Sequence, residues 1–511
     1  MSIGKIIFLS LILIGTIFLV YTPHINYPFP LHIDEWHHIS EGLRMGNYGE
    51  YLNFLKAEES TRFPGLEIGF HFILFLLSGL VDLVKIYQFL PALWTALTSL
   101  ILFGVTYQKT NKNFLLAVLA MIFFASIKSN VNFLGLQFFT PLTFAIPFIF
   151  LYIYFFSEGL KKEDPRKILI SLGIMIFLIP IHSISVLFAL PILLLYSSLN
   201  YKFVFKKLPI FLSFLLIPLI GILFYKYIID IPWAEVLSRV IDQLQFKYGW
   251  GVLEVANSPT ELYSPIAYFF ALIGAGFLIL AKKSKEYAIY LLWPLVMLIL
   301  IIIYRVTGIS YLSPYQRNLY YLAISLPFLS ACGLYFTLEG FDYYLGRWLT
   351  QKQSVGQIKK LATIIVNLHL EPWQIKLIQK TTILIISLTI IFFTFNNYYY
   401  APPDLAIYHT IDQDDYKMLK FLATLAPGKV IATPFMSTAV YPIAHKDPVA
   451  LLVFYGSVKN IENFFLFTDC QAKESIIKRL NISYIISPAP LNCNYKVLYA
   501  QNGNIIYDAN N

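Results

Sequence analysis

Long apolar runs separated by short polar loops occupy most of the chain before residue 397. The first run, Lys5 to about Pro23, is long enough to cross a bilayer, which takes about 20 residues. No small-residue cleavage site follows it, so we expect a retained anchor rather than a removed signal peptide. Ten further apolar runs follow, at 86–107, 113–128, 138–157, 167–181, 183–198, 208–229, 262–281, 286–304, 318–338 and 378–396. The pattern predicts a mainly α, polytopic membrane protein with about eleven transmembrane helices.

Two apolar stretches leave the topology open, and the basic residues decide between the alternatives. Residues 66–81 either span the membrane or lie in its interface, and residues 167–198 form either one kinked helix or two short ones. Pro180 and the polar side chains after it make a natural turning point in the second stretch. Most basic loops fall on the cytoplasmic side if residues 66–81 lie in the interface and residues 167–198 span the membrane twice. This arrangement satisfies the positive-inside rule. We therefore expect a multi-pass cell-membrane protein with a cytoplasmic N-terminus and an extracytoplasmic tail.

The polar regions of the chain predict its domain organisation. A large first external loop covers residues 24–85 and belongs to a membrane domain of residues 1–396. The long apolar runs end before residue 397, and the pattern of residues 397–511 predicts a small extracytoplasmic α/β domain. Its helices are expected after the acidic cap Asp412–Asp415 and at Ala472–Leu480. Its strands are expected at Val430–Ala432, Ala450–Phe454, Ile482–Ile486 and Lys496–Tyr499.

Composition supports the membrane assignment and removes one class of partner. The chain is 58% hydrophobic and only 13% charged, whereas a soluble domain has roughly 25% charged residues. Its formal net charge of +9 follows from lysines in the loops between apolar runs, so we expect no nucleic-acid partner. Two of the three cysteines, Cys470 and Cys493, lie in the tail, where a disulfide between them is possible. The tail also contains one glycosylation sequon, Asn481-Ile482-Ser483.

The most polar motif of the chain, His32-Ile33-Asp34-Glu35-Trp36-His37-His38, follows the first apolar run. A helix that begins near Asp34 places Asp34, His37, His38 and Glu41 on one face, with Glu35 turned away from them. A carboxylate at the membrane boundary can act as a general base towards a hydroxyl group. His37, His38 and Glu41 are candidate ligands for a divalent cation such as Mg²⁺ or Mn²⁺. The alternative is an interfacial helix whose polar face is merely solvated.

Three further polar residues stand beside apolar runs. Arg317 lies at the outer end of one run, with Arg305 twelve residues before it. A guanidinium group binds phosphate through two donors and stays charged when desolvated, which suits a lipid phosphate at headgroup depth. The alternative is an arginine that extends to the interface from a helix end. His182 has the same predicted depth, and its alternative is a buried structural histidine.

These residues together resemble the GT-C superfamily of integral-membrane glycosyltransferases, which use sugars carried on polyprenyl phosphates. The segment Pro30-Leu31-His32-Ile33-Asp34-Glu35-Trp36-His37 is similar to the His-x-Asp-Glu-x-His motif in the first luminal loop of protein O-mannosyltransferases. Two amphipathic helices, Glu41–Asn47 and one after Arg62-Phe63-Pro64-Gly65, are similar to that family's juxtamembrane pair. The segment Pro-Tyr-Gln-Arg-Asn-Leu-Tyr at 314–320 resembles the helix start whose arginine contacts the lipid phosphate.

The resemblance implies an inverting glycosyltransferase that moves a sugar from a polyprenyl-phosphate carrier to an extracytoplasmic hydroxyl on a glycan, lipid or protein. Asp34 would be the catalytic base, and Glu35 would orient the acceptor or a cation. Arg317 would hold the donor phosphate with help from Arg305, and His182 would line the donor pocket.

The chain also departs from parts of this superfamily. Oligosaccharyltransferases have a second acidic motif in the next external loop and a Trp-Trp-Asp motif in the soluble domain. Here Lys128–Phe133 contains no acid and the tail contains no tryptophan, so en bloc oligosaccharide transfer is not expected. A transporter or flippase of lipid-linked saccharides and a non-catalytic membrane scaffold remain alternatives. A transporter often has internal repeats or paired broken helices, which the sequence does not show.

Overall fold

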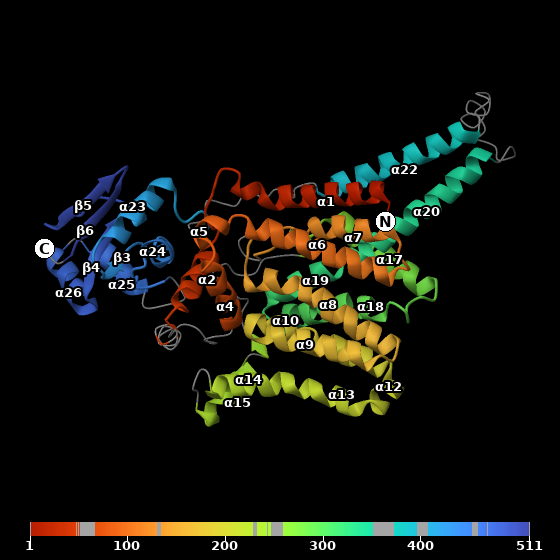
Figure 1. The fold of residues 1–511 in the computed structure, drawn as a ribbon, viewed down its shortest axis with the longest axis horizontal. Coiled ribbons are helices and arrows are strands. Elements are labelled where there is room, and N and C mark those ends of the chain that lie inside the picture. Colours follow the sequence, from red (N-terminus) through yellow and green to blue (C-terminus); the bar gives the residue numbers. More distant parts are fainter. Residues whose placement is uncertain are drawn as a thin grey trace.

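The computed structural model is an elongated helix bundle with a small sheet domain at one end (Figure 1). The N-terminus lies at the opposite end of the bundle from that domain. The structure describes residues 2–47, 49, 51, 67–129, 134–227, 232–242, 244–246, 259–350, 372–395, 407–451, 458–467 and 469–509.

Each of the eleven predicted apolar runs contains one helix or a broken pair of helices. The helices are α1 (Ile3–Tyr21), α6 (Leu90–Lys109), α7 (Phe114–Ala125), α8 (Pro141–Lys161), α9 (Pro165–His182), α10 (Ile184–Leu187) with α11 (Leu190–Ser198), α13 (Leu208–Leu212) with α14 (Leu216–Tyr227), α17 (Pro265–Leu280), α18 (Ala288–Thr307), α19 (Tyr315–Ser325) with α20 (Pro327–Thr350), and α22 (Pro372–Thr394). By length and composition, six helical stretches in the described part of the chain are able to cross a membrane: Ile3–His24, Leu90–Lys109, Pro141–Lys161, Pro165–His182, Ala288–Thr307 and Tyr315–Tyr344. The protein is therefore a mainly helical, multi-pass membrane protein, while a pass by each of the shorter apolar helices stays a prediction.

The two ambiguous stretches are resolved as helices. Residues 66–81 contain α4 (Ile68–Ser78), whose 11 residues are too few to span a bilayer. Residues 167–198 break after His182, two residues beyond Pro180, where α9 gives way to α10 and α11. The predicted break is therefore confirmed.

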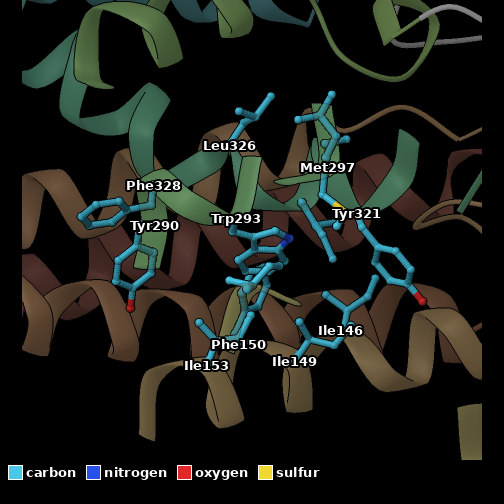
Figure 2. Close-up of a cluster of buried hydrophobic side chains, with 14 of the residues drawn as sticks. Ile146, Ile149, Phe150, Ile153, Tyr290, Trp293, Met297, Tyr321, Leu326 and Phe328 are labelled. Atoms are coloured by element: carbon cyan, nitrogen blue, oxygen red, sulfur yellow. The ribbon is translucent and has the colours of Figure 1, made fainter. Parts of the chain in front are cut away.

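Aromatic side chains fill the centre of the bundle (Figure 2). Trp293 of α18 packs against Phe150 of α8 and Phe188, with ring centroids 6.2 and 5.9 Å away. Phe188 in turn stacks on Tyr321 of α19 at 3.8 Å. Offset and tilted aromatic pairs of this kind stabilise a core beyond their apolar area.

Two glycines allow α17 and α20 to touch. A Cβ atom at Gly274 would lie 2.0 Å from the carbonyl oxygen of Leu329, and one at Gly333 would lie 1.9 Å from that of Phe270. Any larger residue at either position would force the two backbones apart. Small residues commonly serve this purpose between membrane helices.

The remaining short elements of the first 350 residues connect these helices. They are η1 (Thr22–His24), α2 (Ile33–Arg44), α5 (Leu83–Ile86), α12 (Tyr201–Lys206), η2 (Ser213–Leu215), α15 (Trp233–Asp242), β1 (Gln245–Phe246), α16 (Pro259–Leu262) and β2 (Ser310–Tyr311). The two short strands pair antiparallel. The helix predicted at Glu41–Asn47 is not separate, because Glu41 to Arg44 continue α2. Residues 62–65 lie outside the described part, and α4 follows them.

The C-terminal domain has a four-stranded sheet of order β3-β4-β6-β5. The β3–β4 pair is parallel and the other two pairs are antiparallel. The elements of the domain are α23 (Gln413–Thr424), β3 (Lys429–Ile431), α24 (Ser437–Ala444), α25 (Val458–Leu466), α26 (Cys470–Leu480), β4 (Ile482–Ser487), β5 (Lys496–Gln501) and β6 (Asn504–Asp508). The acid-capped helix, the helix at Ala472–Leu480 and three of the four strands are confirmed. The strand predicted at Ala450–Phe454 lies mostly outside the described residues, and β6 was not predicted.

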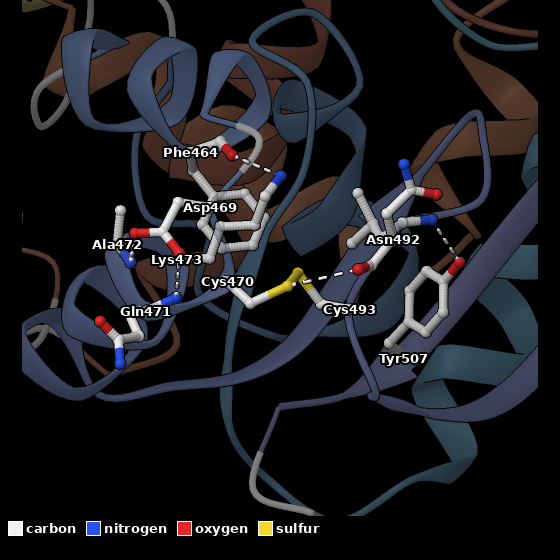
Figure 3. The surroundings of a disulfide bond; sticks show 10 residues. Phe464, Asp469, Cys470, Gln471, Ala472, Lys473, Asn492, Cys493 and Tyr507 are labelled. Atoms are coloured by element: carbon white, nitrogen blue, oxygen red, sulfur yellow. Dashed lines mark hydrogen bonds between the residues drawn. A yellow bond between two sulfur atoms is a disulfide. The ribbon is translucent and has the colours of Figure 1, made fainter.

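A disulfide joins Cys470, the first residue of α26, to Cys493 before β5 (Figure 3). Beside it, Lys473 donates to the carbonyl oxygen of Phe464 at 2.9 Å. The possible bridge is present, and it ties the start of α26 to the segment before β5.

The C-terminal domain packs directly on the first loop, with α2, α4 and α5 between it and the bundle (Figure 1). The Arg44 guanidinium pairs with Asp447 at 2.7 Å and lies 3.6 Å from the ring centre of Tyr441. The N–H of His409 donates to the carbonyl oxygen of Leu31 at 2.9 Å. Loop and tail also share one hydrophobic core, so the tail forms the outer wall of the region that contains the acidic motif.

Candidate active site

Helix α2 begins with a capping box made by His32 and Glu35. The Nδ1 atom of His32 accepts the backbone N–H of Asp34 at 3.1 Å, and Glu35 Oε2 accepts the N–H of His32 at 3.2 Å. The His32 ring nitrogen thus caps the N-terminus of the helix, as a serine or threonine side-chain oxygen usually does. Because Nδ1 accepts, a neutral His32 ring carries its proton on Nε2. That Nε2 atom is buried and has no hydrogen-bond partner among the described residues.

Glu35 is fully buried and bonds only backbone amides. Besides His32, its carboxylate accepts the N–H groups of Leu31 at 2.7 Å and Phe139 at 2.8 Å. Burial raises the pKa of Glu35 to about 8, and the three amide donors oppose that rise. The Phe139 bond ties the first loop to the segment before α8. The sequence predicted Glu35 as a catalytic residue that orients the acceptor or a cation, and that role stays a prediction. In the structure Glu35 has a positioning contact, because its two oxygens bind backbone amides and hold the start of α2 against the segment before α8.

Asp34 lies next to Glu35 in the sequence but faces a different environment. Its side chain is 27% exposed, and its Oδ1 lies 3.6 Å from His32 Nδ1. It stands in the first turn of α2, where the helix dipole favours a negative charge. Asp34 is therefore an accessible carboxylate held on a rigid helix start.

Further along α2, imidazole and carboxylate groups form a buried cluster with α4. Glu41 Oε1 lies 2.6 Å from His37 Nε2, and Glu41 Oε2 lies 2.8 Å from His71 Nδ1. His71 Nε2 is 3.1 Å from His38 Nδ1, and Glu67 Oε2 is 3.8 Å from the same His38 atom. The hydroxyl group of Tyr51 lies 2.9 Å from His71 Nδ1.

The cluster groups the candidate metal ligands differently from the sequence prediction. Ligand atoms of His38, Glu67 and His71 all lie within 4.8 Å of one another. Of the predicted trio His37, His38 and Glu41, only His38 belongs to this group. His37 Nε2 contacts one oxygen of Glu41, and the other oxygen of Glu41 faces His71 Nδ1. Glu67 and His71 were missed. A histidine inside the apolar run at 66–81 was the available signal.

Arg317, near the start of α19, is close enough to act electrostatically on three groups of this region. Its charge acts on His32 and His182 and opposes the rise that burial and Glu41 impose on the pKa of Glu67. Burial lowers the pKa of His32, and Arg317 lowers it further against the opposing charge of Asp34. The structure therefore brings Arg317 together with the acidic motif, although they are far apart in the sequence.

Hydrogen bonds fix the helix start that carries Arg317. Asn318 Nδ2 donates to Ser310 Oγ at 2.9 Å, and the hydroxyl of Ser313 donates to Asn318 Oδ1. Arg305 donates its Nε–H to the hydroxyl group of Tyr315, the first residue of α19, at 2.8 Å. Arg305 therefore contacts this helix start, and its side chain is exposed.

His182 ends α9 and is buried. Its Nδ1 lies 2.7 Å from Ser185 Oγ, and that oxygen lies 3.0 Å from the hydroxyl group of Tyr321. The charges of Arg317 and His38 both interact with the His182 ring. His182 therefore borders the region between Arg317 and the α2–α4 cluster.

No protein-family model and no curated protein sequence matches the chain, but solved structures match over almost its whole length. The oligosaccharyltransferase AglB from Archaeoglobus fulgidus, in complex with an inhibitory peptide and a dolichol-phosphate, is 13% identical, with a TM-score of 0.52 over 95% of this chain and 70% of that chain. An oligosaccharyltransferase from Archaeoglobus fulgidus in complex with Zn and sulfate gives a TM-score of 0.54 at 12% identity, over 93% of this chain and 68% of that chain. ArnT from Cupriavidus metallidurans, bound to undecaprenyl phosphate, is 12% identical, with a TM-score of 0.54 over 100% and 98%. AglB and ArnT are GT-C superfamily enzymes, and the chain has their fold.

Proposed function

We propose that the chain is an inverting glycosyltransferase that moves a sugar from a polyprenyl-phosphate carrier to a hydroxyl group of an extracytoplasmic glycan, lipid or protein. The carrying observation is that the Arg317 charge acts on both His32 and His182, and that the accessible Asp34 lies 3.6 Å from the same His32. A phosphate ligand and a base are thus available on one side of the bundle. Bound dolichol-phosphate and undecaprenyl phosphate in two structural neighbours support the same donor class.

In this reaction Asp34 accepts the proton of the acceptor hydroxyl as the acceptor oxygen attacks the anomeric carbon. The bond from that carbon to the phosphate oxygen breaks, and the polyprenyl phosphate leaves with the bonding pair. The configuration at carbon inverts because one displacement takes place. Since phosphate is a good leaving group, the protein mainly orients the reactants and stabilises the anion.

Two donors are suited to that phosphate. The Arg317 guanidinium offers a bidentate, permanently charged contact. The buried Nε2–H of His32 offers a neutral one, because the cap to Asp34 fixes its tautomer. His182 would line the donor pocket behind them. Arg305 would act through Tyr315 by holding the start of α19.

A divalent cation in the α2–α4 cluster would add positive charge beside the leaving phosphate. The two histidines and Glu67 supply a suitable donor set. The presence of Zn and sulfate in a structural neighbour supports a cation in this fold.

The proposed orientation puts the N-terminus in the cytoplasm and the tail outside. The N-terminus and the C-terminal domain lie at opposite ends of the bundle (Figure 1), which supports opposite sides of the membrane. The disulfide in the tail supports an oxidising compartment. An apolar carrier would then stay in the bilayer while a polar acceptor arrives from outside, and the partners would be membrane lipids, the carrier and the acceptor.

The test is to offer the detergent-purified protein a panel of radiolabelled polyprenyl-phosphate sugars. Water and a crude extract of surface glycans serve as acceptors. We expect at least one donor to release its sugar and leave free polyprenyl phosphate. Binding of donors without release would overturn the transferase and favour a transporter of lipid-linked saccharides. Neither binding nor release would favour a scaffold.

A further inference from the structure

We infer that Tyr321 and Ser185 form a hydrogen-bonded relay that holds His182 with its Nε2–H available to a phosphate oxygen of the carrier lipid. Ser185 and Tyr321 are then positioning residues that act through His182. The inference rests on the proposed donor class and adds a phosphate contact to those of Arg317 and His32. Binding of the carrier phosphate can be measured without any sugar transfer.

The relay joins the break between α9 and α10 to α19. His182 Nδ1 lies 2.7 Å from Ser185 Oγ, and that oxygen lies 3.0 Å from the hydroxyl oxygen of Tyr321. All three residues are buried. Buried polar groups depend on their hydrogen-bond partners, so the relay fixes the orientation of all three side chains.

The hydroxyl hydrogens give the relay one direction. In the described part of the chain, the Ser185 hydroxyl bonds only His182 and Tyr321, and the Tyr321 hydroxyl bonds only Ser185. If Tyr321 donates to Ser185 and Ser185 donates to His182 Nδ1, every hydroxyl hydrogen has an acceptor. If Nδ1 carries the hydrogen instead, one hydroxyl hydrogen is buried without an acceptor, which is costly. A neutral His182 ring therefore carries its proton on Nε2.

The charge of Arg317 acts on both ends of the relay. Arg317 and Tyr321 are four residues apart on α19, so they lie on one face of that helix. The guanidinium charge acts on the Tyr321 hydroxyl and on the His182 ring, and the His182 ring acts on His38 of α2. Since Ser185 occupies Nδ1, Nε2 is the nitrogen available to a ligand in this region. A phosphate held by Arg317 is such a ligand.

The packing around the relay holds its hydroxyl groups in place. The Tyr321 ring stacks on Phe188 with ring centroids 3.8 Å apart, and its hydroxyl points away from the ring of Trp293 (Figure 2). Tyr152 donates to the carbonyl oxygen of Ser185 at 2.8 Å. A donor that is oriented before binding loses little conformational freedom when its ligand arrives. This pre-organisation favours a contact between a neutral imidazole and a phosphate.

The competing interpretation is that the three side chains only satisfy one another and touch no ligand. The two interpretations differ in the binding of a carrier phosphate without its sugar. Undecaprenyl phosphate and dolichol phosphate are titrated into the full-length protein in detergent, and undecaprenol serves as the probe without a phosphate. We expect Ser185→Ala to weaken binding of the phosphates about tenfold, the order expected for one hydrogen bond to a charged group. Undecaprenol binding should not change.

Tyr321→Phe tests the relay with the smallest structural change. The ring and its stack on Phe188 remain, while the hydroxyl that sets the direction of the relay is lost. We expect the phosphates to bind about threefold more weakly, because the ring is then free to carry its proton on either nitrogen. Tyr263→Phe is the matched control, since it removes a buried hydroxyl that donates to the Phe123 carbonyl oxygen at 3.0 Å. It should bind the phosphates as the wild type does.

A double-mutant cycle decides whether Ser185 acts through His182. His182→Leu should weaken phosphate binding at least tenfold. Adding Ser185→Ala to His182→Leu should cause no further loss, because a positioning residue has no effect without the group that it positions. Thermal unfolding in the same detergent shows which variants are folded. If Ser185→Ala does not fold, Tyr321→Phe and its control decide alone.

Four outcomes would overturn the relay. They are a wild type that binds neither phosphate, folded Ser185→Ala and Tyr321→Phe proteins that bind as tightly as wild type, additive losses in the cycle, and a loss seen only with sugar-bearing donors. The last result would place the contact on the sugar. Relay-dependent phosphate binding without sugar transfer would contradict the proposed function and keep the relay. Sugar transfer by a wild type whose relay variants bind phosphate normally would do the reverse.

Discussion

Asp34 and Glu35 are neighbours in the sequence, yet their carboxylates lie in different environments. Successive residues of a helix point about 100° apart, so the sequence could predict that the two face different directions. It could not predict that Glu35 would meet the amide of Phe139, 104 residues later. The same limit applies to the cluster, because only tertiary packing brings His71 and Glu67 against His38. Local motifs therefore identified Asp34 and Arg317 as candidates, while the partners of each depend on the fold.

The amide contacts of Glu35 predict that its carboxylate stabilises the fold. Both of its oxygens accept amide N–H groups, so in Glu35→Gln the side-chain NH₂ must face at least one backbone donor. We expect a loss of about 1–3 kcal/mol in the free energy of unfolding, the usual penalty for a buried group left without its partner. Unfolding in detergent measures it. Glu474→Gln, at an exposed position in α26, is the control. A Glu35→Gln protein as stable as this control would contradict the positioning role.

Among the elements, the apolar runs predicted the helices well because a long hydrophobic run has few other stable forms in a bilayer. Strand β6 was missed although Asn502-Gly503, with φ of 51° and 86°, is a strong hairpin signal before it. Which helices touch was not predictable from hydropathy, since lipid and protein are equally apolar surroundings. The close contact of α17 with α20 depends on single glycines that composition does not reveal.

The α17–α20 contact predicts a difference between two glycines of one helix. In Gly274→Ala the new methyl group would meet the Leu329 carbonyl oxygen at 2.0 Å, so we expect a loss of about 1–3 kcal/mol from overpacking. Gly276→Ala is the matched control, because no atom lies within 4 Å of its added Cβ. Thermal unfolding in one detergent compares the two. Equal melting temperatures would show that the helices do not touch in this way.

In the whole molecule, the C-terminal domain and the first loop form one body around the candidate site. The Arg44–Asp447 pair and the shared core join them. The sequence predicted the tail as a separate small α/β domain, and nothing in its local pattern indicated where it would dock. The alternation of apolar runs and basic loops predicted an extracytoplasmic tail, and that orientation stays a prediction.

That orientation predicts the redox state of the cysteines. In an extracytoplasmic tail, Cys470 and Cys493 should be oxidised in protein taken from cells under alkylating conditions. Mass spectrometry after denaturation without reductant should find only the buried Cys332 labelled. Reductant should expose the other two thiols, and Cys470→Ser should expose Cys493 without it. Three labelled cysteines before reduction would contradict an oxidising location for the tail.

Sugar transfer by the Asp34→Asn variant is the most direct test of the proposed chemistry. With a donor that the wild type uses, we expect turnover to fall at least about 100-fold, the contribution typical of a positioned base, while donor binding and thermal unfolding stay unchanged. Asp469→Asn is the control, because it exchanges one good helix cap for another in the tail, at the start of α26. Turnover within twofold of wild type in Asp34→Asn would contradict the assignment of Asp34 as the base.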